Sequence, residues 1–449
     1  MPSNTDRERI PTTLRQPGAG RFWLAVALTG VVTGISAAVL TLLLEAVQSF
    51  FWGGSGKDIA EAAARAQPSR HVLVLLAAGL VTGLGQIALR RLSSANGIDT
   101  TSAIWLHAGR MPAWRTLGSA VLSVIVVGMG VSLGREGAPK QAGAVAANLF
   151  SDGLGLSDEQ RRLLVACGAG AGMGAAYGVP LGGALFSLEV MRGMLALRYV
   201  LPALFASLIA TAVSWIALPD APTYSMPSYS NSASVLLWAL LAGPIAGVVS
   251  VGYVRAVRWA DRNRPQGSWE RFATPLLGMG VLGLVSIWFP QILGNGKDIS
   301  QLAFVDQVPA MSLMFLLVLK PAATLLCMRS GVPGGLFTPS LAVGALLGGV
   351  LGHAWSFVYP GVSPGLCAFL GAGAMLAGTT QGPLSTVVLL MELTGGDRSF
   401  ILPLLLTVGA ASLTARTIDH RSIYDARLTD EEIEQRRTLR EQVLHSAAG

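Results

Sequence analysis

One short charged segment, flanked by glycine and proline, interrupts a long apolar part of this chain. Residues Ser132–Pro139 (S-L-G-R-E-G-A-P) follow the apolar run Leu117–Val131 and precede a small-residue helix expected over Gln141–Leu149. Glycine allows backbone groups to approach closely, and Pro139 suits the first turn of a helix. The start of that helix exposes unpaired N–H groups and the positive end of the helix dipole. The segment therefore predicts an anion-binding site.

Glu136 is the titratable group of this segment. An ionised carboxylate competes with an anion for the same N–H groups, whereas a protonated one can swing away. We predict that Glu136 is a gate and a proton carrier, because an ionisable residue at membrane depth is a functional candidate by default. The alternative is that Glu136 pairs with Arg135 or Lys140 and only holds the turn. Lys140 is unusual at a helix start, because a cation there opposes the helix dipole. Three interpretations are open: Lys140 lines a vestibule and attracts anions, it pairs with Glu136, or it extends to a membrane interface.

A second segment, Gly334–Pro339 (G-G-L-F-T-P), repeats the pattern of glycine, proline and a following apolar helix, but it carries no charge. Irregular backbone at membrane depth is tolerated only where protein or a watery cavity surrounds it. Two such helix starts that converge on one anion would bind it through backbone dipoles, without the tight hold of full positive charges.

The two segments belong to duplicated halves. Residues Cys167–Gly193 align without a gap on Leu370–Gly396, and the shared residues include the pairs Pro180/Pro383, Leu181/Leu384 and Glu189/Glu392. Residues Ala95–Asp99 (A-N-G-I-D) likewise match Gly294–Asp298 (G-N-G-K-D). The collinear matches predict halves of about 22–218 and 235–415. Secondary transporters commonly use this plan, often with inverted halves that hold the substrate at their interface.

Composition places these halves in a membrane. The 449 residues are 52% hydrophobic and 13% charged, with a mean hydropathy of +0.55, whereas soluble domains usually carry about 25% charged residues. Several apolar stretches approach the ~20 residues that cross the hydrocarbon core as a helix. They are Phe22–Val47, Val72–Leu89, Val235–Val257, Leu313–Met328 and the glycine-rich Gly335–Gly352 and Gly365–Gly378. The sequence predicts an all-α, multi-pass membrane protein with many tilted and broken helices.

Basic residues flank the membrane block. They cluster in Arg7–Arg21 and Arg416–Arg440, and the positive-inside rule places such segments in the cytoplasm. We expect a cytoplasmic N-terminal segment over 1–21, a membrane domain over 22–424 and a short cytoplasmic helix or tail over 425–449. Both termini then lie on one side of the membrane, which requires an even number of crossings.

The same pattern excludes other classes of protein. The net charge of +7 and the pI near 9.7 follow from the flanking basic segments, so we expect no nucleic-acid partner. The three cysteines and five histidines are scattered, which predicts neither a disulfide framework, a metal site nor a catalytic constellation. We therefore expect no enzyme and no cofactor, with a small anion as the transported ligand and the lipid bilayer as the surroundings.

An ordered set of motifs resembles the ClC family of chloride channels and chloride/proton antiporters. The motifs are G-R-E-G-x-P at Gly134–Pro139, the A-A-Y/F-x-x-P-L-x-G-x-L-F-x-x-E stretch within Gly174–Arg192, G-x-F-x-P at Gly335–Pro339, Glu392 at the end of the second copy, and the tyrosine of Ser422–Tyr424. The likeness spans about Phe22–Tyr424 and is closest to bacterial-type members without a cytoplasmic regulatory domain. It implies two inverted halves, a homodimer with an anion path in each subunit, and a bacterial inner-membrane location.

The resemblance also assigns roles to individual residues. It implies that the central anion is held by backbone N–H groups of Gly335, Leu336 and Phe337 and by the hydroxyl of Tyr424. From its position alone, Tyr424 is equally an aromatic anchor at the membrane interface.

The outer anion site, by the same resemblance, is lined by the backbone around Glu136 and Gly137, with Glu136 as the external gate. The family's G-S-G-I-P loop, whose serine touches the central anion, appears here as Ala95–Asp99, so Asn96 and Gly97 take the place of anion ligands. An amide also donates to an anion, and the change opens the alternatives of fluoride or nitrate selectivity. The repeat mate Asn295 favours the other interpretation, in which asparagine only turns the chain.

The inner proton route departs from the family as well. Many antiporters of the family carry two adjacent glutamates, the second of which relays protons, but this chain has Glu189 followed by Val190. Glu189 is therefore either a proton group or a structural residue matched by Glu392. We predict transport of small inorganic anions, above all chloride, gated by Glu136, with proton counter-transport left open. The alternatives are an uncoupled voltage- or pH-gated chloride channel and an antiporter selective for fluoride or nitrate.

Overall fold

The computed structural model describes residues 18–53, 58–92, 99–229 and 232–448. In these ranges the regular secondary structure consists of helices, which are joined by turns and loops. The first half contains α2 (Ala19–Trp52), α3 (Ile59–Ala64), α4 (Pro68–Leu92), α5 (Thr100–Leu106), α6 (Ala113–Gly128), α7 (Gly137–Gly153), α8 (Asp158–Tyr177), α9 (Pro180–Phe186), the π-helical turn η2 (Ser187–Met191) and α10 (Leu197–Ser214).

The second half follows the same order of elements. It contains α11 (Ala233–Arg262), α12 (Ser268–Ser286), η3 (Pro290–Ile292), α13 (Lys297–Phe304), α14 (Ala310–Arg329), α15 (Phe337–Ser356), α16 (Pro364–Thr380), α17 (Pro383–Leu393), η4 (Arg398–Phe400) and α18 (Ile401–Ile418). The short helix η5 (Ile423–Arg427) and α19 (Asp430–Ala448) complete the chain.

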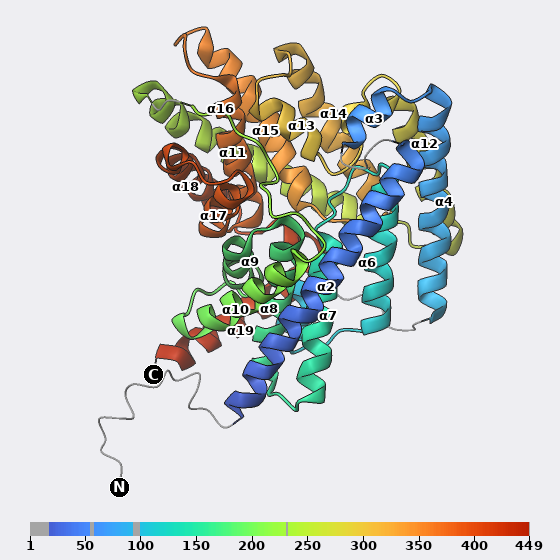
Figure 1. Cartoon of the computed structure of the whole chain (residues 1–449), viewed down its shortest axis with the longest axis vertical. Helices are drawn as coiled ribbons and strands as arrows, with labels where there is room; N and C mark the ends of the chain where they lie inside the picture. Colours follow the sequence, from blue (N-terminus) through green and yellow to red (C-terminus); the bar gives the residue numbers. More distant parts are fainter. Residues whose placement is uncertain (1–17, 54–57, 93–98, 230–231, 449) are drawn as a thin grey trace.

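The two halves repeat one packing arrangement. Helix α2 packs against α7, α8 and α10, and its counterpart α11 packs against α15, α16 and α18. Helices α4 and α12 pack against each other across the halves. Figure 1 shows the first half in blue and green and the second in yellow to red, with α15 and α16 beside each other as α7 and α8 are. The predicted duplication is confirmed.

Glycine brings the helices of each half unusually close. A Cβ atom added at Gly143 in α7 would collide with the carbonyl of Gly168 in α8, and a Cβ at Gly168 would collide with the carbonyl of Gly143. Only hydrogen at both positions allows the two backbones to touch. Small residues at helix contacts are the usual means of association inside a membrane, where apolar surface alone gives little driving force.

Long apolar helices occur throughout the described chain. Seven of the described helices are long and apolar enough to cross a bilayer, and four shorter apolar helices are found at Ala113–Gly128, Pro180–Met191, Pro364–Thr380 and Pro383–Leu393. Three of these short helices begin with proline, as expected for a helix that starts within the membrane layer. The prediction of a multi-pass protein with broken helices is confirmed.

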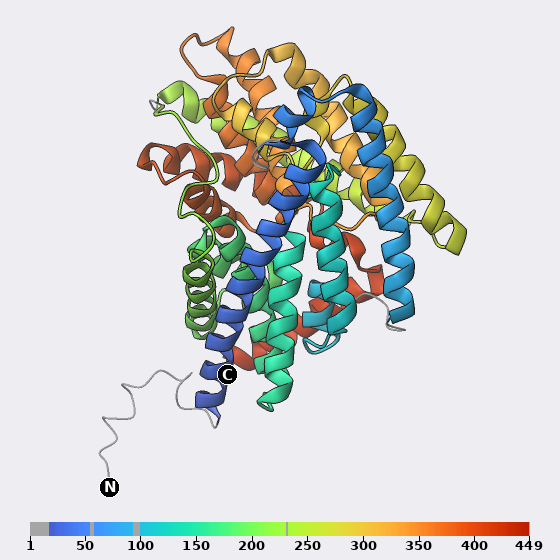
Figure 2. The same ribbon diagram turned by 45° about the vertical axis from the view of Figure 1, so that its right-hand side comes forward.

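Helix α19 and the start of α2 lie at one end of the molecule, whereas α3 and α13 lie at the opposite end (Figures 1 and 2). The solvated helix expected from Asp425 begins later, at Asp430, because Asp425 belongs to η5 and is buried against Arg436. Arg258 and Arg262 donate hydrogen bonds to Asp430, and these bonds hold the pKa of that carboxyl below its usual value. These contacts fasten α19 to the end of α11.

Candidate functional site

The two glycine-rich helix starts lie side by side. Gly134 and Gly335 exchange two backbone hydrogen bonds, each 2.8 Å long, in an isolated antiparallel bridge. Helices α7 and α15 begin immediately after this bridge, with Pro139 and Pro339 in their first turns. The structure therefore brings together two helix N-termini from the two halves, as the duplication predicted.

The carboxylate of Glu136 lies between these two starts, and the residue is 3% exposed. Its Oε1 accepts a 2.6 Å hydrogen bond from the N–H of Phe337, and its Oε2 accepts a 3.1 Å bond from the hydroxyl of Thr338. The neighbouring cations face elsewhere, because Arg135 lies over the ring of Tyr177 and Lys140 points away to a different ring. The gate candidate is thus held by the second half rather than by Arg135 or Lys140.

A pair of hydroxyl groups fastens the same carboxylate. The hydroxyl of Tyr177 lies 3.4 Å from Glu136 Oε2 and 2.9 Å from the hydroxyl of Thr338. An ionised carboxylate can only accept, so the Thr338 hydroxyl donates to it, and the single hydrogen of the Tyr177 hydroxyl points to the carboxylate or to the Thr338 oxygen. We call Tyr177 and Thr338 the hydroxyl latch.

The Glu136 carboxylate lies against both glycines of the bridge, so a side chain at either position could be accommodated only if the carboxylate moved. A Cβ added at Gly134 or at Gly335 would collide with Glu136 Oε1. The Cβ at Gly335 would also lie 3.0 Å from the N–H nitrogen of Gly137. The space beside the bridge therefore has room for one small anionic group and for no side chain.

Two cavities approach this point from opposite ends of the molecule. The α3-side cavity, about 250 Å³, is lined by Arg135, Tyr177 and Lys297 among others. The α19-side cavity, about 470 Å³, is lined by Gly137 and Gly334 at its inner end. Because residues 135 and 137 line different cavities, the Glu136 carboxylate stands between them.

Tyr424 approaches from the α19 side. It is half-buried, its ring makes an edge contact with Phe186 at 5.7 Å between centroids, and Lys140 Nζ lies 4.6 Å from the centre of the ring. Tyr424 is therefore linked to α7 within the protein, and the interpretation of Tyr424 as a lone interfacial anchor does not describe its surroundings.

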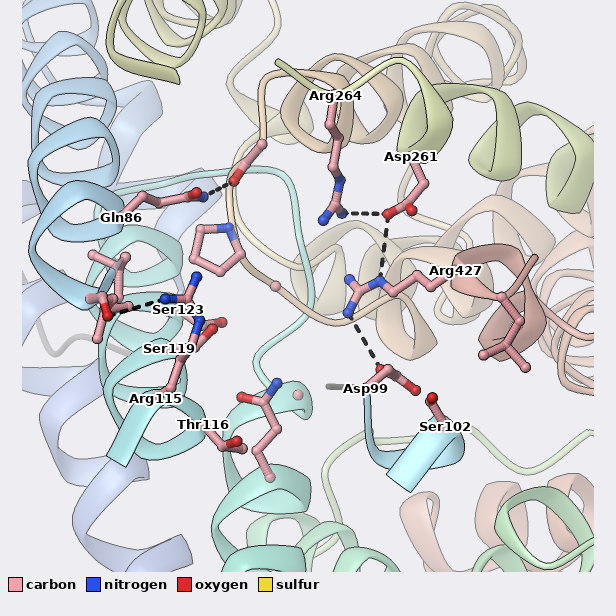
Figure 3. A pocket seen from close by; sticks show the side chains of 18 of the residues that line it. Gln86, Asp99, Ser102, Arg115, Thr116, Ser119, Ser123, Asp261, Arg264 and Arg427 are labelled. Atoms are coloured by element: carbon pink, nitrogen blue, oxygen red, sulfur yellow. Dashed lines mark hydrogen bonds and ion pairs between the residues drawn. The ribbon is translucent and has the colours of Figure 1, made fainter. Parts of the chain in front are cut away.

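Charged side chains link the two halves at the mouth of the α19-side cavity. Asp99 accepts a hydrogen bond from the N–H of Thr101, so it caps α5, and its Oδ1 lies 3.5 Å from Arg427. Arg427 also lies 3.6 Å from Asp261, which pairs with Arg264 at 2.8 Å. Figure 3 shows Arg427 between the two aspartates. The network holds η5, which carries Tyr424, to both α5 and the end of α11.

Lys320 is a second structural link, and it is fully buried in α14. Its Nζ donates to the hydroxyl of Ser132 at 3.0 Å and to the carbonyls of Ile292 and Gly294 at 2.9 and 2.8 Å. All three N–H groups of the ammonium therefore have partners. Lys320 ties the segment before Glu136 to the loop before α13.

Glu189 and Glu392 cap each other's short helices. The carboxylate of Glu189 accepts from the N–H groups of Leu384 and Ser385 at 3.2 and 2.6 Å. Glu392 accepts from the equivalent groups of Leu181 and Gly182 at 3.0 and 2.6 Å. The reciprocity shows that the halves are related by a two-fold arrangement, and it gives Glu189 a structural role.

Asn96 and Gly97, the candidate anion ligands in the first half, lie outside the described residues. Their repeat mate is described: Asn295 Oδ1 accepts a 3.1 Å hydrogen bond from the N–H of Lys297 and so caps the start of α13. This contact favours the turn-forming interpretation for the second half. The predicted ligands Gly335, Leu336 and Phe337 all lie at the bridge and the start of α15.

Sequence reasoning did not single out the hydroxyl latch, Lys320 or Arg427. Thr338 stands at a variable position of its motif, and Tyr177 at a position that tyrosine shares with phenylalanine, so only their approach to Glu136 reveals a role for the hydroxyl groups. A signal for Lys320 was present, because it is the one charged residue between Leu313 and Met328.

The fold and the site define an integral membrane protein with an enclosed carboxylate between two cavities, built from duplicated halves. The family described as voltage gated chloride channel matches residues 78–416, and the chain belongs to this family.

Individual relatives cover nearly the whole chain. The H(+)/Cl(-) exchange transporter ClcA of Salmonella arizonae is 29% identical, over 95% of this chain and 90% of the relative. The voltage-gated ClC-type chloride channel ClcB of Citrobacter koseri is 28% identical, over 90% of this chain and 98% of the relative. The fold is similar to that of a slow cyanobacterial Cl-/H+ antiporter, with a TM-score of 0.79 and 24% identity over 95% of this chain and 99% of that one.

Proposed function

We propose that this protein carries chloride across a bacterial inner membrane and that Glu136 is the gate. The observation that carries the proposal is the place of the Glu136 carboxylate, which accepts the N–H of Phe337 and separates two cavities. A carboxylate at a helix N-terminus occupies the position that a free anion takes there. The names of the relatives, which include both an H(+)/Cl(-) exchanger and a chloride channel, support chloride as the cargo.

Protonation of Glu136 opens the path in this proposal. The ionised carboxylate is stabilised by the N–H of Phe337 and by the hydroxyl latch. Protonation removes the charge that these donors stabilise, so the side chain leaves and chloride takes its place. If Glu136 takes up its proton on one side of the membrane and releases it on the other, chloride and protons move in opposite directions.

A second candidate is an uncoupled chloride channel. Val190 favours it, because valine cannot relay a proton, and the adjacent Glu189 is occupied as a helix cap. Proton exchange through Glu136 then requires an inner route that does not use residue 190, such as water in the α19-side cavity.

The assembly and orientation form part of the same proposal. We infer a homodimer with one anion path in each subunit, and a cytoplasmic location for the end that carries α19 and the start of α2. Arginines gather in and around α19 at this end, in agreement with the positive-inside rule. The molecular mass of the purified protein in detergent tests the dimer, and labelling of single cysteines in α19 tests the orientation.

Flux from reconstituted vesicles tests the function. A tenfold chloride gradient is expected to drive uphill proton movement by the native protein, whereas an uncoupled channel gives chloride flux and no proton movement. Glu136→Gln is expected to keep chloride flux and to lose its pH dependence and all proton movement. A Glu136→Gln variant that folds but shows no chloride flux would contradict the assignment of Glu136 as the gate. Fluoride or nitrate flux as fast as chloride flux, or faster, in a competition assay would contradict chloride as the preferred anion.

A further inference from the structure

Lys140 is a buried cation beside the candidate anion site. It lies in the first turn of α7, four positions after Glu136, and it is 8% exposed. Its Nζ lies 4.6 Å from the ring centre of Tyr424, the tyrosine whose hydroxyl is expected at the central anion. Lys140 therefore neither extends to a membrane interface nor pairs with Glu136, two of the three alternatives that the sequence left open for it.

The ammonium group of Lys140 lacks hydrogen-bond partners. Among the described residues it donates no hydrogen bond and has no carboxylate within 4.0 Å, and its contact is the face of the Tyr424 ring. Lys320 shows how the same chain buries a lysine that is structural, with three acceptors at 2.8–3.0 Å. Burial of a lysine without such partners is costly. The carboxylates of Asp99 and Glu136 act on the Lys140 charge only from a distance, so no described group completes its hydrogen bonds.

The position of Lys140 indicates what the missing partner is. Lys140 of α7 contacts Tyr424 of η5, and other residues of the same two elements, Gly137 and Arg427, line the α19-side cavity together with Gly334. A small monovalent anion placed there would accept from the ammonium and from the tyrosine hydroxyl, and would neutralise the buried charge. Cation and anion then stabilise each other away from bulk water.

We propose that the Lys140 ammonium is a ligand of the central anion site and that the transported small inorganic anion is its missing hydrogen-bond partner. The proposal rests on the proposed function, and it adds a full positive charge to a site expected to use backbone dipoles. Such a charge makes the anion bind more tightly and leave more slowly than dipoles alone would.

The charge on Lys140 also makes anion binding depend on pH. The charged and titratable groups that act on it come from the segment before α7, from α5 and from η5, and they are Glu136, Asp99, Arg427 and Tyr424. When the amine loses its proton at alkaline pH, the site loses its full charge, and anion affinity falls.

Chloride binding to the purified full-length protein tests the proposal. Isothermal titration calorimetry in detergent, with a bulky anion as background salt, compares native protein with Lys140→Met, Lys140→Arg and the control Arg255→Met. Lys140→Met is expected to weaken chloride binding at least ~tenfold, the factor that 1.4 kcal/mol represents. Lys140→Arg keeps the charge and is expected to stay within ~threefold of native. Arg255 is an exposed arginine of α11 that pairs with Asp419, and its loss is expected to leave binding unchanged.

A second measurement covers the case in which Lys140→Met does not fold. In a Glu136→Gln background, which removes the gate, chloride affinity is measured from pH 6 to pH 10 with lysine and with arginine at position 140. We expect a decline at alkaline pH with lysine and none with arginine, since the guanidinium stays charged. Equal pH profiles, or Lys140→Met binding chloride as tightly as native protein, would overturn the proposal. If native protein in vesicles carries no chloride at all, the proposed function fails instead.

Discussion

The two helix starts share a backbone design and differ in their side chains. The first, Gly134–Pro139, carries Arg135 and Glu136, whereas the second, Gly334–Pro339, carries no charge. In the structure the uncharged start supplies donors, through the N–H of Phe337 and the hydroxyl of Thr338, and the charged start supplies the acceptor. Each start is therefore incomplete without the other.

The comparison of the two halves distinguishes residues with a structural role from residues that can do chemistry. Where the halves kept the same residue, as at Glu189 and Glu392, each copy caps the other's helix and the role is structural. Where the halves differ, as at the two helix starts, the first half carries the titratable Glu136 and the second half supplies the hydrogen-bond donors Phe337 and Thr338. In this protein, a charged residue of the duplicated segments without an equivalent in the other half is therefore the better functional candidate.

The largest effect on chloride flux is expected from substitutions of the two glycines that form the bridge between the helix starts. Gly134→Ala and Gly335→Ala each place a methyl group in the space that the Glu136 carboxylate fills. Because chloride would use the same space when the gate is protonated, both variants are expected to lower chloride flux at least ~tenfold, about 1.4 kcal/mol in barrier height. Flux from vesicles at pH 5, where the gate is open, measures the effect.

A matched glycine provides the control for that experiment. Gly252 lies inside α11, and a Cβ there meets nothing within 4 Å. Gly252→Ala is expected to leave flux unchanged. If Gly134→Ala and Gly335→Ala also leave flux unchanged, the anion does not pass beside the bridge.

A smaller effect is expected from the hydroxyl latch, in which Thr338 belongs to the second start and Tyr177 to the end of α8. Thr338→Val removes a donor from the ionised carboxylate, so the gate protonates and opens at higher pH. A hydrogen bond to a charged group contributes roughly 1.5–3 kcal/mol, and one pH unit corresponds to about 1.4 kcal/mol. We expect the pH of half-maximal flux to rise by about one unit.

Tyr177→Phe tests the weaker member of the latch. Its contact with Glu136 is longer, at 3.4 Å, so we expect a shift in the same direction and of smaller size. Tyr224→Phe, a buried tyrosine without a hydrogen bond to Glu136 in the described residues, is the control. A shift to lower pH in either latch variant would contradict the latch.

The smallest effect on transport is expected from the two glutamates that are equivalent in the two halves. Glu189→Gln and Glu392→Gln each weaken one helix cap, and each is expected to lower the free energy of unfolding by about 1 kcal/mol. Denaturation in detergent measures the stability, and vesicle assays measure the proton-to-chloride ratio, which is expected to stay native in both. Loss of proton movement in Glu189→Gln alone would break the symmetry and make Glu189 a proton group.

Much of the fold was predictable from local patterns. Apolar stretches predicted the spans, and the prolines Pro139 and Pro339 marked the first turns of two helices, which begin at Gly137 and Phe337. The first of these helices was expected only from Gln141. The duplication predicted that the two starts converge. Within the expected C-terminal helix or tail, α19 begins at Asp430, because Asp425 belongs to η5 and is buried by Arg436, a long-range contact that composition does not report.

The sequence by itself determined the membrane class, the paired halves and the identity of Glu136 as the gate candidate, because these depend on hydropathy and on residue types at fixed spacing. Only the tertiary structure decided which groups hold the Glu136 carboxylate, since Tyr177, Phe337 and Thr338 reach it from other helices. It also decided the fate of Lys140. A lysine at a helix start can face lipid headgroups, a carboxylate or a cavity, and packing against Tyr424 selects among them.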